Sequence, residues 1–375
     1  MSFEKSLEKS IGLIKNFYNQ TTGSGIYQKE FTYYCMERWI SEGHVNNDTD
    51  LNELFMFDVE AIHCLSNLGW CEAQFFPEFE CEVLEDRGEH ELVRDFAGRS
   101  VLFFKNRRNG FMPEYVDHPV KDMKTWEKDV KWRLDPNTPD RLPVLKAAGL
   151  AAKEAAGKGL FVCQKVVGGY MYLRSLMGPE QLLYQFYDAP ELVHACMKAW
   201  LELADKVTAE HQKYVNIDEL FLAEDICYKS GSLISPDAMR EFLFPYYQQL
   251  ITNIKSRQLD KNTKLNIQID TDGFCIPVID LYKTLGMNYM SPFEVASNCD
   301  VVQVRKDYPD LLISGGIDKR ILAKSKDAID AELERIMPFM KKHGGYIPTC
   351  DHGVPEEVSF ENYMHYRKRM VEYSK

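Results

Sequence analysis

The sequence lacks the features that mark membrane-spanning, secreted and nucleic-acid-binding proteins. No apolar run approaches the roughly 18 residues that a membrane-crossing helix needs, and the first 15 residues form a charged amphipathic pattern rather than a secretory signal. Basic side chains are outnumbered, 45 against 57 acidic ones, which gives a formal net charge of −12. Because phosphate binding needs basic patches, this balance argues against nucleic acid as a main partner.

Several short motifs are also missing. The chain contains no Gly-x-Gly-x-x-Gly, no phosphate-binding loop with Gly-Lys-Ser/Thr and no Gly-x-Ser-x-Gly, so dinucleotide, nucleotide and serine-hydrolase functions are set aside. Ten cysteines are present, but none forms a Cys-x-x-Cys pair. This pattern predicts reduced thiols in a cytoplasmic protein rather than a disulfide framework.

After residue 150, apolar strand patterns alternate with helical patterns. Such sustained alternation predicts a parallel sheet. A polar residue follows each expected strand, which favours a closed (β/α)8 TIM barrel over an open sheet. The expected strands lie at 161–167, 220–222, 265–269, 287–290, and in the runs before 315 and before 348.

The N-terminal part reads differently. We expect helices at 3–18 and 51–68, and a small antiparallel β meander at 79–104. The first barrel strands are expected near 73–76. The predicted organisation is an extension of helices and β insertion over 1–110, packed on a barrel over 111–375, forming one domain overall.

Two strand ends carry pairs of reactive side chains. Asp270 and Asp272 follow one expected strand, and Cys350 and His352 follow another. In an extended chain, residues i and i+2 face the same way, so each pair can point into a barrel mouth. Two carboxylates, a thiolate and an imidazole suit a divalent metal. The alternative is that the aspartates cap the next helix and that Cys350 is a core residue.

Other strand ends add further acids. Glu224 and Asp225, followed by Tyr228 and Lys229, could act in general acid–base catalysis and substrate binding, or form an ordinary helix start with a surface salt bridge. Glu294 follows another strand and is a candidate base.

Two further loops complete the predicted site. Asp318 and Lys319 open a helix after two glycines, where a helix N-terminus with a cation attracts carboxylates. The alternative is that Asp318 is a helix cap. Asp351 lies between Cys350 and His352, and is expected to contact substrate.

At these residues the chain resembles the uroporphyrinogen decarboxylase superfamily, which joins haem-pathway decarboxylases to cobalamin-dependent methyltransferases. The resemblance covers roughly residues 110 to 370 and is most specific in the last third. The motifs that carry it are His118–Asp122 with Trp126, Arg133–Pro136, Gly178–Glu180, Ala189–Val193, Ala223–Asp225, Ile234–Pro236, Pro245-Tyr246, Asp270–Gly273, Pro292–Val295, Gly315–Lys319 and Gly345–His352.

The resemblance implies a (β/α)8 barrel and favours the methyltransferase branch. The decarboxylases carry an early Met-Arg-Gln-Ala-Gly-Arg tract that binds the substrate's carboxylate arms, and the first forty residues lack it. A similar stretch, Arg107–Tyr115, comes much later in the chain. The methyltransferase branch binds zinc through a His-x-Cys pair and a later Cys. Asp270 and Asp272 stand in the first two places and Cys350 in the third, which leaves Asp272, Cys350 and His352 as the expected metal ligands.

The resulting expectation is an enzyme that moves a methyl group between a small substrate and a corrinoid. The methylcobamide would be supplied by a partner corrinoid protein, since the chain has no Asp-x-His-x-x-Gly motif. A divalent metal, zinc or manganese, or else an acid would activate the substrate oxygen, nitrogen or sulfur as leaving group, so a metal-free site is also open. The alternatives are a tetrapyrrole decarboxylase that needs no cofactor, and a non-enzymatic corrinoid- or tetrapyrrole-binding protein. No membrane partner is expected, and a homodimer is left open.

Overall fold

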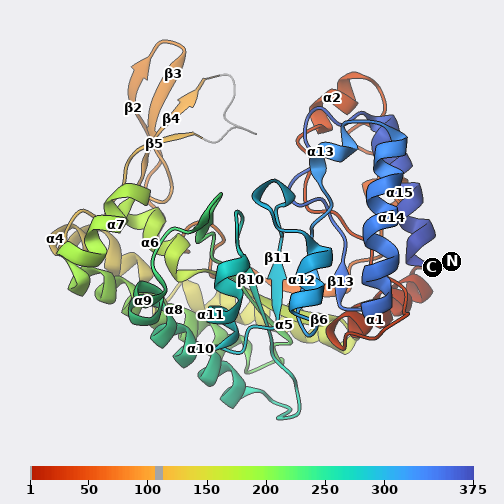
Figure 1. Cartoon of the computed structure of the whole chain (residues 1–375). Helices are drawn as coiled ribbons and strands as arrows, with labels where there is room; N and C mark the ends of the chain where they lie inside the picture. The colour runs from red at the N-terminus through yellow and green to blue at the C-terminus, as the bar shows by residue number, and fades with distance from the viewer. Residues whose placement is uncertain (1, 106–112) are drawn as a thin grey trace.

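The computed structural model describes residues 2–105 and 113–375. Seven parallel strands form one curled sheet in the order β1-β6-β7-β10-β11-β12-β13 (Figure 1). All six neighbouring pairs are parallel. The strands are β1 Ile62–Leu65, β6 Phe161–Val167, β7 Glu219–Ala223, β10 Asn266–Asp270, β11 Tyr289–Ser291, β12 Leu312–Ser314 and β13 Tyr346–Ile347.

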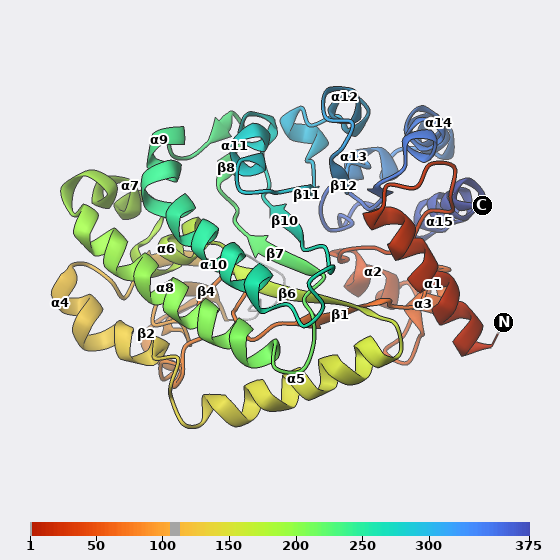
Figure 2. The ribbon, with the colours of Figure 1, turned by 90° about the horizontal axis from the view of Figure 1, so that it is seen from below.

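Helices connect these strands and cover the outer side of the sheet (Figure 2). Parallel neighbours need such crossovers, and a sheet buried on both faces reads as a nearly continuous apolar run, as all five buried residues of β7 illustrate. The connecting elements are α5 Arg141–Gly157, α6 Gly169–Met177, α7 Pro179–Asp188, α8 Pro190–His211, α9 Pro236–Ala238, the π-helix Met239–Leu243, α10 Phe244–Arg257, the 3₁₀ turn Ile276–Val278, α11 Ile279–Lys283, the 3₁₀ turn Val295–Ser297, α12 Val301–Asp307, α13 Lys319–Leu322, α14 Lys326–His343 and α15 Phe360–Ser374.

An irregular stretch spans the side between β13 and β1. Tyr33 bridges Val354 in parallel beyond β13, and Glu30 accepts a hydrogen bond from the backbone N–H of Cys350 at 3.0 Å. On the other side, the carbonyl of Gln28 accepts from the N–H of Asp58, shortly before β1. The described residues therefore supply seven barrel strands, and residues 26–33 stand where an eighth would close the ring.

The N-terminal helix α1, Phe3–Tyr18, lies on the lower side of the molecule, beside the C-terminal helices (Figure 2). Its Tyr18 hydroxyl donates to Glu219 of β7 at 2.6 Å, inside the sheet. The rings of Phe17 and Tyr289 meet edge-on at 5.1 Å. These contacts hold the last turn of α1 against the first residues of β7 and β11, at the amino-terminal ends of the strands.

A second, antiparallel sheet projects from the upper side (Figure 1). It has the order β2-β3-β4-β5, with β2 Glu82–Arg87, β3 His90–Arg94, β4 Ser100–Phe104 and β5 Glu114–Asp117. This is the antiparallel meander that the sequence predicted. The remaining short elements are α2 Met36–Ser41, α3 Leu51–Leu54, α4 Met123–Thr125, the π-helix Trp126–Val130, the 3₁₀ helix Lys131–Leu134, and the hairpin β8 Cys227–Tyr228 with β9 Gly231–Ser232.

The structure confirms the α/β barrel type and corrects the N-terminal assignments. The expected helix over 51–68 is only one turn, α3, after which the chain extends into β1. The region 73–76 is not a strand. The first barrel strand therefore lies within the segment assigned to the extension, where Cys64 pairs in register with Cys163 of β6. Most of the Arg107–Tyr115 stretch lies outside the described residues.

No helix in residues 2–105 and 113–375 is long and apolar enough to cross a membrane.

Candidate active site

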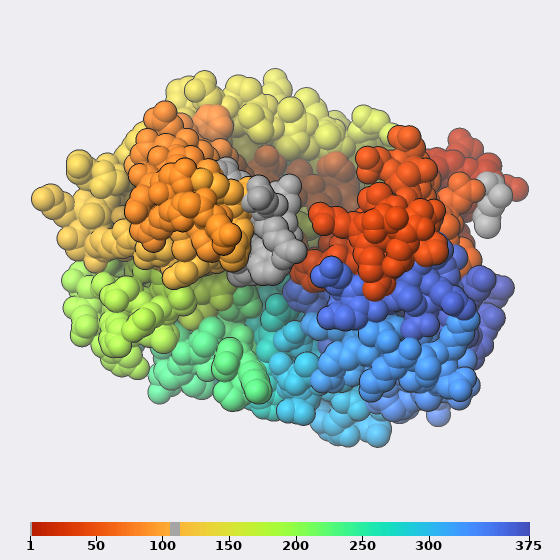
Figure 3. Space-filling view, turned by 90° about the horizontal axis from the view of Figure 1, so that it is seen from above, coloured from red at the N-terminus to blue at the C-terminus, as the bar shows by residue number. Residues whose placement is uncertain are grey.

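The candidate site lies on the upper face, where the parallel strands end. Seen from above, this face is hollowed between the small sheet, in orange, and the segment that carries α2 and α3, in red-orange (Figure 3). The carboxyl ends of parallel strands collect functional groups in barrel proteins. Most of the predicted site residues follow a strand at this end.

Asp270 and Asp272 form the acidic centre of the site. Asp270 ends β10 and accepts a hydrogen bond from the Ser291 hydroxyl at 2.7 Å. Burial raises the pKa of Asp270 to about 6. Burial, together with the negative charges of Asp225, Asp270 and Glu294, raises the pKa of Asp272 to about 8. At neutral pH the Asp272 carboxyl is therefore mostly protonated and can donate a proton.

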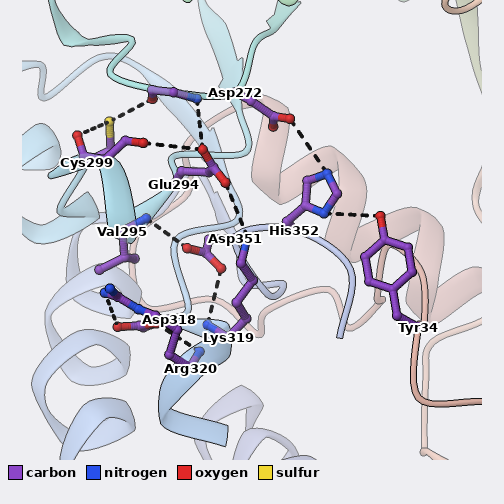
Figure 4. Close-up of polar contacts among 12 residues, drawn as sticks. Tyr34, Asp272, Glu294, Val295, Cys299, Asp318, Lys319, Arg320, Asp351 and His352 are labelled. Carbon is purple, nitrogen blue, oxygen red and sulfur yellow. Dashed lines mark hydrogen bonds and ion pairs between the residues drawn. The ribbon is translucent and has the colours of Figure 1, made fainter. Parts of the chain in front are cut away.

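Glu294 ties two loops of the site together (Figure 4). It accepts from the backbone N–H of Gly273 at 3.1 Å and from the Lys319 ammonium at 3.2 Å. Although burial opposes this, these hydrogen bonds and the Lys319 charge hold the pKa of Glu294 below its usual value. Glu294 therefore stays ionised while Asp272 holds its proton, so the two neighbouring acids differ in charge.

His352 lies between Asp272 and an aromatic wall (Figure 4). Its Nε2 is 3.6 Å from an Asp272 carboxylate oxygen, and its Nδ1 is 3.4 Å from the Tyr34 hydroxyl. The Phe31 ring meets the imidazole edge-on at 5.9 Å. Burial, and then the Lys319 charge, lower the pKa of His352. The imidazole is thus mainly neutral at pH 7 and able to exchange protons with Asp272.

Asp351 and Asp318 hold backbone rather than facing open space. Asp351 is fully buried and accepts from the N–H groups of Val295 and Lys319, at 2.8 and 3.2 Å. Asp318 caps α13 through the N–H of Arg320 and also pairs with the Arg320 guanidinium at 2.8 Å. Both acids were predicted to bind substrate. In the structure each of them instead accepts hydrogen bonds from backbone N–H groups. The Lys319 ammonium, next to Asp318 in the chain, reaches the site.

The loop after β7 contributes one acid, Asp225, to the site, and its exposed side chains lie at the rim. Asp225 has a left-handed backbone, with φ +42°, and pairs with Arg174 at 2.6 Å. Non-glycine residues rarely adopt this left-handed conformation, and those that do are typical of functional loops. Tyr228, on the β8–β9 hairpin, is 60% exposed, and Lys229 beside it is also exposed. These two predicted substrate-binding residues stand at the rim.

Glu224 does not face the mouth, contrary to its predicted catalytic role. Its carboxylate is fully buried and accepts from the Tyr247 hydroxyl at 2.6 Å and from the N–H of Tyr170 at 3.2 Å. A Cβ on Gly168 would collide with it. Burial raises the pKa of Glu224 to about 7. It therefore locks the end of β7 to α6 and α10.

The burial of Glu224 predicts how the stability of the fold depends on pH. A carboxyl whose pKa is raised on folding stabilises the fold below its unfolded pKa, and this contribution is lost as pH rises from about 4.3 toward about 7. When the pH is raised from about 5 to about 8, we expect the melting temperature of Glu224→Gln to fall less than that of the wild type. Thermal melts followed by circular dichroism measure this, with the exposed Glu241→Gln as the control. Equal pH slopes for wild type and Glu224→Gln would contradict it.

The predicted metal set is not assembled. Asp272 and His352 pair, but Cys350 is buried, and its thiol interacts mainly with Glu30 and further with Asp351 and Lys319. Among residues 2–105 and 113–375, no group of three or more His, Cys, Asp or Glu side chains is placed to hold a metal ion. The donor set Asp272, Cys350 and His352 therefore does not fit a metal, and we derive no step through one.

Three contributors to the mouth, Lys165, Trp70 and Phe31, were not predicted from the sequence. The Lys165 ammonium, in the middle of β6, lies 4.9 Å from the centre of the Trp70 ring. Trp70 stacks at 5.0 Å on Phe221 and at 6.4 Å on Phe31. These rings continue the wall that begins at His352. The available signal was Lys165 in the middle of a mostly apolar strand, next to Gln164. Trp70 and Phe31 lie in irregular segments with no pattern to mark them.

The assembled site can exchange protons and hold a small ligand. One protonated carboxyl, one ionised carboxyl, an imidazole and an ammonium converge at the open end of a parallel α/β barrel, beside aromatic rings. Fold and site together define an α/β-barrel enzyme with acid–base groups on its strand ends.

Residues 107–373 match the uroporphyrinogen decarboxylase (URO-D) family, and the chain belongs to this family. A uroporphyrinogen decarboxylase of Alcanivorax borkumensis is 28% identical over 200 residues, which is 50% of each chain. One of Geobacter metallireducens is 24% identical over 259 residues, 68% of this chain and 72% of that one. The chain thus matches about half of the first relative's length.

A solved methyltransferase from Methanosarcina mazei has the same fold. It superposes with a TM-score of 0.59 over 97% of this chain and 98% of that chain, at 15% sequence identity. At this level of identity the likeness concerns the fold alone. The family contains enzymes, and the reaction of this chain is a separate question.

Proposed function

We propose that this chain is a methyltransferase that moves a methyl group between a small methylated substrate and a corrinoid carried by a separate protein. The observation that carries the proposal is the charge of the mouth. Asp225, Asp270, Asp272 and Glu294 line it, and burial together with the charges of the other three raises the pKa of Asp272 to about 8. A small neutral or cationic substrate suits such a mouth, whereas several carboxylate arms do not.

The cations near the mouth are already neutralised in part. Arg174 pairs with Asp225 at 2.6 Å, and Lys319 pairs with Glu294 at 3.2 Å. Removing either cation from its acid to bind a substrate carboxylate would leave a partly buried charge unpaired, which is costly. This counts against a substrate with many carboxylates, and it supports methyl transfer over decarboxylation of such a substrate.

In this proposal Asp272 is the proton donor. When the methyl group leaves the substrate, the oxygen, nitrogen or sulfur it leaves gains electron density, and the Asp272 proton neutralises it. His352, 3.6 Å away, returns the proton from solvent. Docked over the mouth, the partner's corrinoid would supply the methyl-accepting or methyl-donating centre. The aromatic wall of Phe31 and Trp70 excludes water from the substrate's methyl group.

The second candidate is tetrapyrrole decarboxylation, which the names of the relatives favour. There, an acid such as Asp270 would orient pyrrole N–H groups. A cytoplasmic location, expected from the unpaired cysteines, agrees with either reaction.

Two assays on the purified chain separate the candidates. We expect methyl transfer from at least one member of a panel of O-, N- and S-methyl donors to chemically reduced cobalamin, followed by the change in cobalamin absorbance. We expect no conversion of uroporphyrinogen to coproporphyrinogen in anaerobic incubations analysed by chromatography. Robust porphyrinogen turnover, with no methyl transfer from any donor, would overturn the proposal in favour of decarboxylation.

A further inference from the structure

A lysine without a counter-ion lies inside the barrel, below the acids of the mouth. Lys165 stands in the middle of β6, level with Phe221 of β7. Its ammonium is 4.9 Å from the centre of the Trp70 ring and 5.8 Å from that of the Phe221 ring. No described residue forms an ion pair or a hydrogen bond with this ammonium. Because an ammonium is strongly hydrated, holding it partly buried without an anionic partner is unfavourable.

A second lysine, Lys29, faces the same space from the irregular stretch between β13 and β1. Its charge acts on the buried carboxyls of Asp270 and Glu219, as the charge of Lys165 does. The neighbouring Glu30 turns the opposite way and accepts from a tyrosine hydroxyl of α15. Within the part of the chain that the structure describes, the Lys29 ammonium also has no ion-pair or hydrogen-bond partner.

The space between the two lysines is open to solvent. Strand β1 lies between them, and its Leu65 packs outward against Ala152 of α5, so Cys64 faces into the barrel. Cys64 is opposite Cys163, which lies two residues below Lys165 in β6. The Cys64 side chain is small and nevertheless exposed. Solvent therefore reaches below the level of Lys165, and the barrel interior is hollow to this depth.

The acids nearest the lysines are already engaged. One carboxylate oxygen of Glu219 accepts from the Cys163 thiol at 3.3 Å, and the other accepts from the Tyr18 hydroxyl at 2.6 Å. Asp270 accepts from the Ser291 hydroxyl at 2.7 Å. An anion that enters from outside would therefore complete the two ammonium groups, and a carboxylate has oxygens enough to accept from both.

The charge of the interior changes sign toward the mouth. In the strand register, Asp270 lies two residues, about 7 Å, closer to the mouth than Lys165. Asp272 lies farther along, paired with His352. The Phe31 ring, which meets His352, is 56% exposed, and exposed ring faces attract methylated ammonium groups. Cations below, with acids and a ring above, match a ligand that has one negative end and one methylated positive end.

We propose that the chain binds a small betaine, a zwitterion with a carboxylate at one end and a methylated ammonium at the other. Its carboxylate lies between Lys29 and Lys165, and its ammonium lies among Asp270, Asp272 and the Phe31 ring. The net charge of such a ligand is zero, so it suits the acidic mouth better than a simple carboxylate does. The proposal names the substrate class of the methyl transfer proposed above and rests on that function for the reaction only, since binding is measured without it.

Binding of matched ligands to the wild-type chain tests both ends of the site. Isothermal titration calorimetry is run with glycine betaine, β-alanine betaine and γ-butyrobetaine. For the betaine that binds best, one analogue carries an alcohol in place of the carboxylate, as choline does for glycine betaine. Another carries a tert-butyl group in place of the trimethylammonium, as tert-butylacetate does. We expect each analogue to bind at least about tenfold more weakly, the loss for one charged contact. Binding of no betaine, or of either analogue as tightly as the betaine, would overturn the proposal.

Variants test the two lysines. Lys165→Met and Lys29→Met should each weaken betaine binding by about tenfold or more and remove the preference for the betaine over its alcohol analogue. Lys153→Met, on the exposed face of α5, is the matched control and should bind like the wild type. Circular dichroism checks that each variant is folded, and either lysine variant alone suffices for the comparison. Betaine binding that is unchanged in the folded lysine variants would count against the site.

The methyl-transfer assay separates this proposal from the proposed function. A betaine that binds through the lysines but gives no methyl group to reduced cobalamin supports the binding site and counts against methyl transfer. Methyl transfer from donors that lack a carboxylate, in a chain that binds no betaine, supports the proposed function and overturns the betaine site.

Discussion

Replacing Asp272 by Asn should lower the methyl-transfer kcat by about 10²- to 10⁴-fold, the range for loss of a positioned general acid. The carboxamide keeps the size of the side chain but cannot give up a proton in this pH range. Substrate binding should change little, because the leaving group gains charge only as the reaction proceeds. Steady-state kinetics with the methyl donor identified in the panel measure both parameters. The matched control is Asp237→Asn, an acid that is almost fully exposed on α9.

The same substitution should make the fold more stable at alkaline pH. The pKa of Asp272 is raised to about 8 in the folded chain. Its favourable contribution is therefore complete below about pH 3.9, where the unfolded chain also binds the proton, and it is lost as pH rises toward about 8. Asn avoids that loss. We expect the melting temperature of Asp272→Asn to exceed that of wild type by more at pH 8.5 than at pH 5, an example of a functional group held at a cost in stability.

The wild-type pH profile gives a third readout. If the protonated Asp272 is the acid, methyl transfer should fall as pH rises through about 8. A variant that is fully active, or a wild-type rate that stays level through that range, would remove Asp272 from the mechanism. If methyl transfer is never detected, the comparison of melting temperatures still tests the protonation state of Asp272 by itself.

The sequence predicted the later barrel strands well because their signals are local. Phe161–Val167 is apolar except for Gln164 and Lys165 in its middle, and its expected and observed bounds agree. Strand β1 was missed because Ile62–Leu65 is only four residues long and follows a segment whose apolar spacing also fits a helix. Its strand character comes from pairing with β6, about 100 residues away, which no local pattern contains.

The site was predictable in location but not in the role of each acid. Asp270, Asp272 and Glu294 follow strands, and the parallel fold brings such positions together. Glu224 also follows a strand, yet one residue of difference turns it away from Asp225 and into the core against Tyr247. The chain leaves the extended conformation here, since β7 ends at Ala223 and Asp225 has a left-handed backbone, and no local sequence pattern marks this turn. The same limit explains why Cys350 turned toward Glu30 instead of joining His352.

Gly315→Ala should have the largest effect on stability among single substitutions near the site. Gly315 has φ +97°, a conformation that L residues rarely adopt. An added Cβ would also lie 2.7 Å from the carbonyl carbon of Pro292 and closer still to its oxygen. Strain and overpacking of this kind each cost about 1–3 kcal/mol. We expect a clear fall in the urea midpoint, measured by circular dichroism.

The contact links stability to the site, so the same variant should also impair function. Pro292 accepts from the N–H of Gly316 at 3.0 Å, and Glu294 follows it in the same loop. Pushing this loop away would weaken the 3.2 Å contact between Glu294 and Lys319 and release the Gly273 N–H.

The control is Gly157→Ala, at the end of α5, where an added Cβ meets nothing within 4 Å and the backbone is helical. That change should be neutral or stabilise by up to about 1 kcal/mol. An unchanged urea midpoint in Gly315→Ala would mean that the loop after β12 accommodates the added methyl group with little loss in the free energy of unfolding. In that case the loop would not hold Glu294 in place, and the rigid positioning of this acid beside Asp272 would have to come from Lys319 and Gly273 alone.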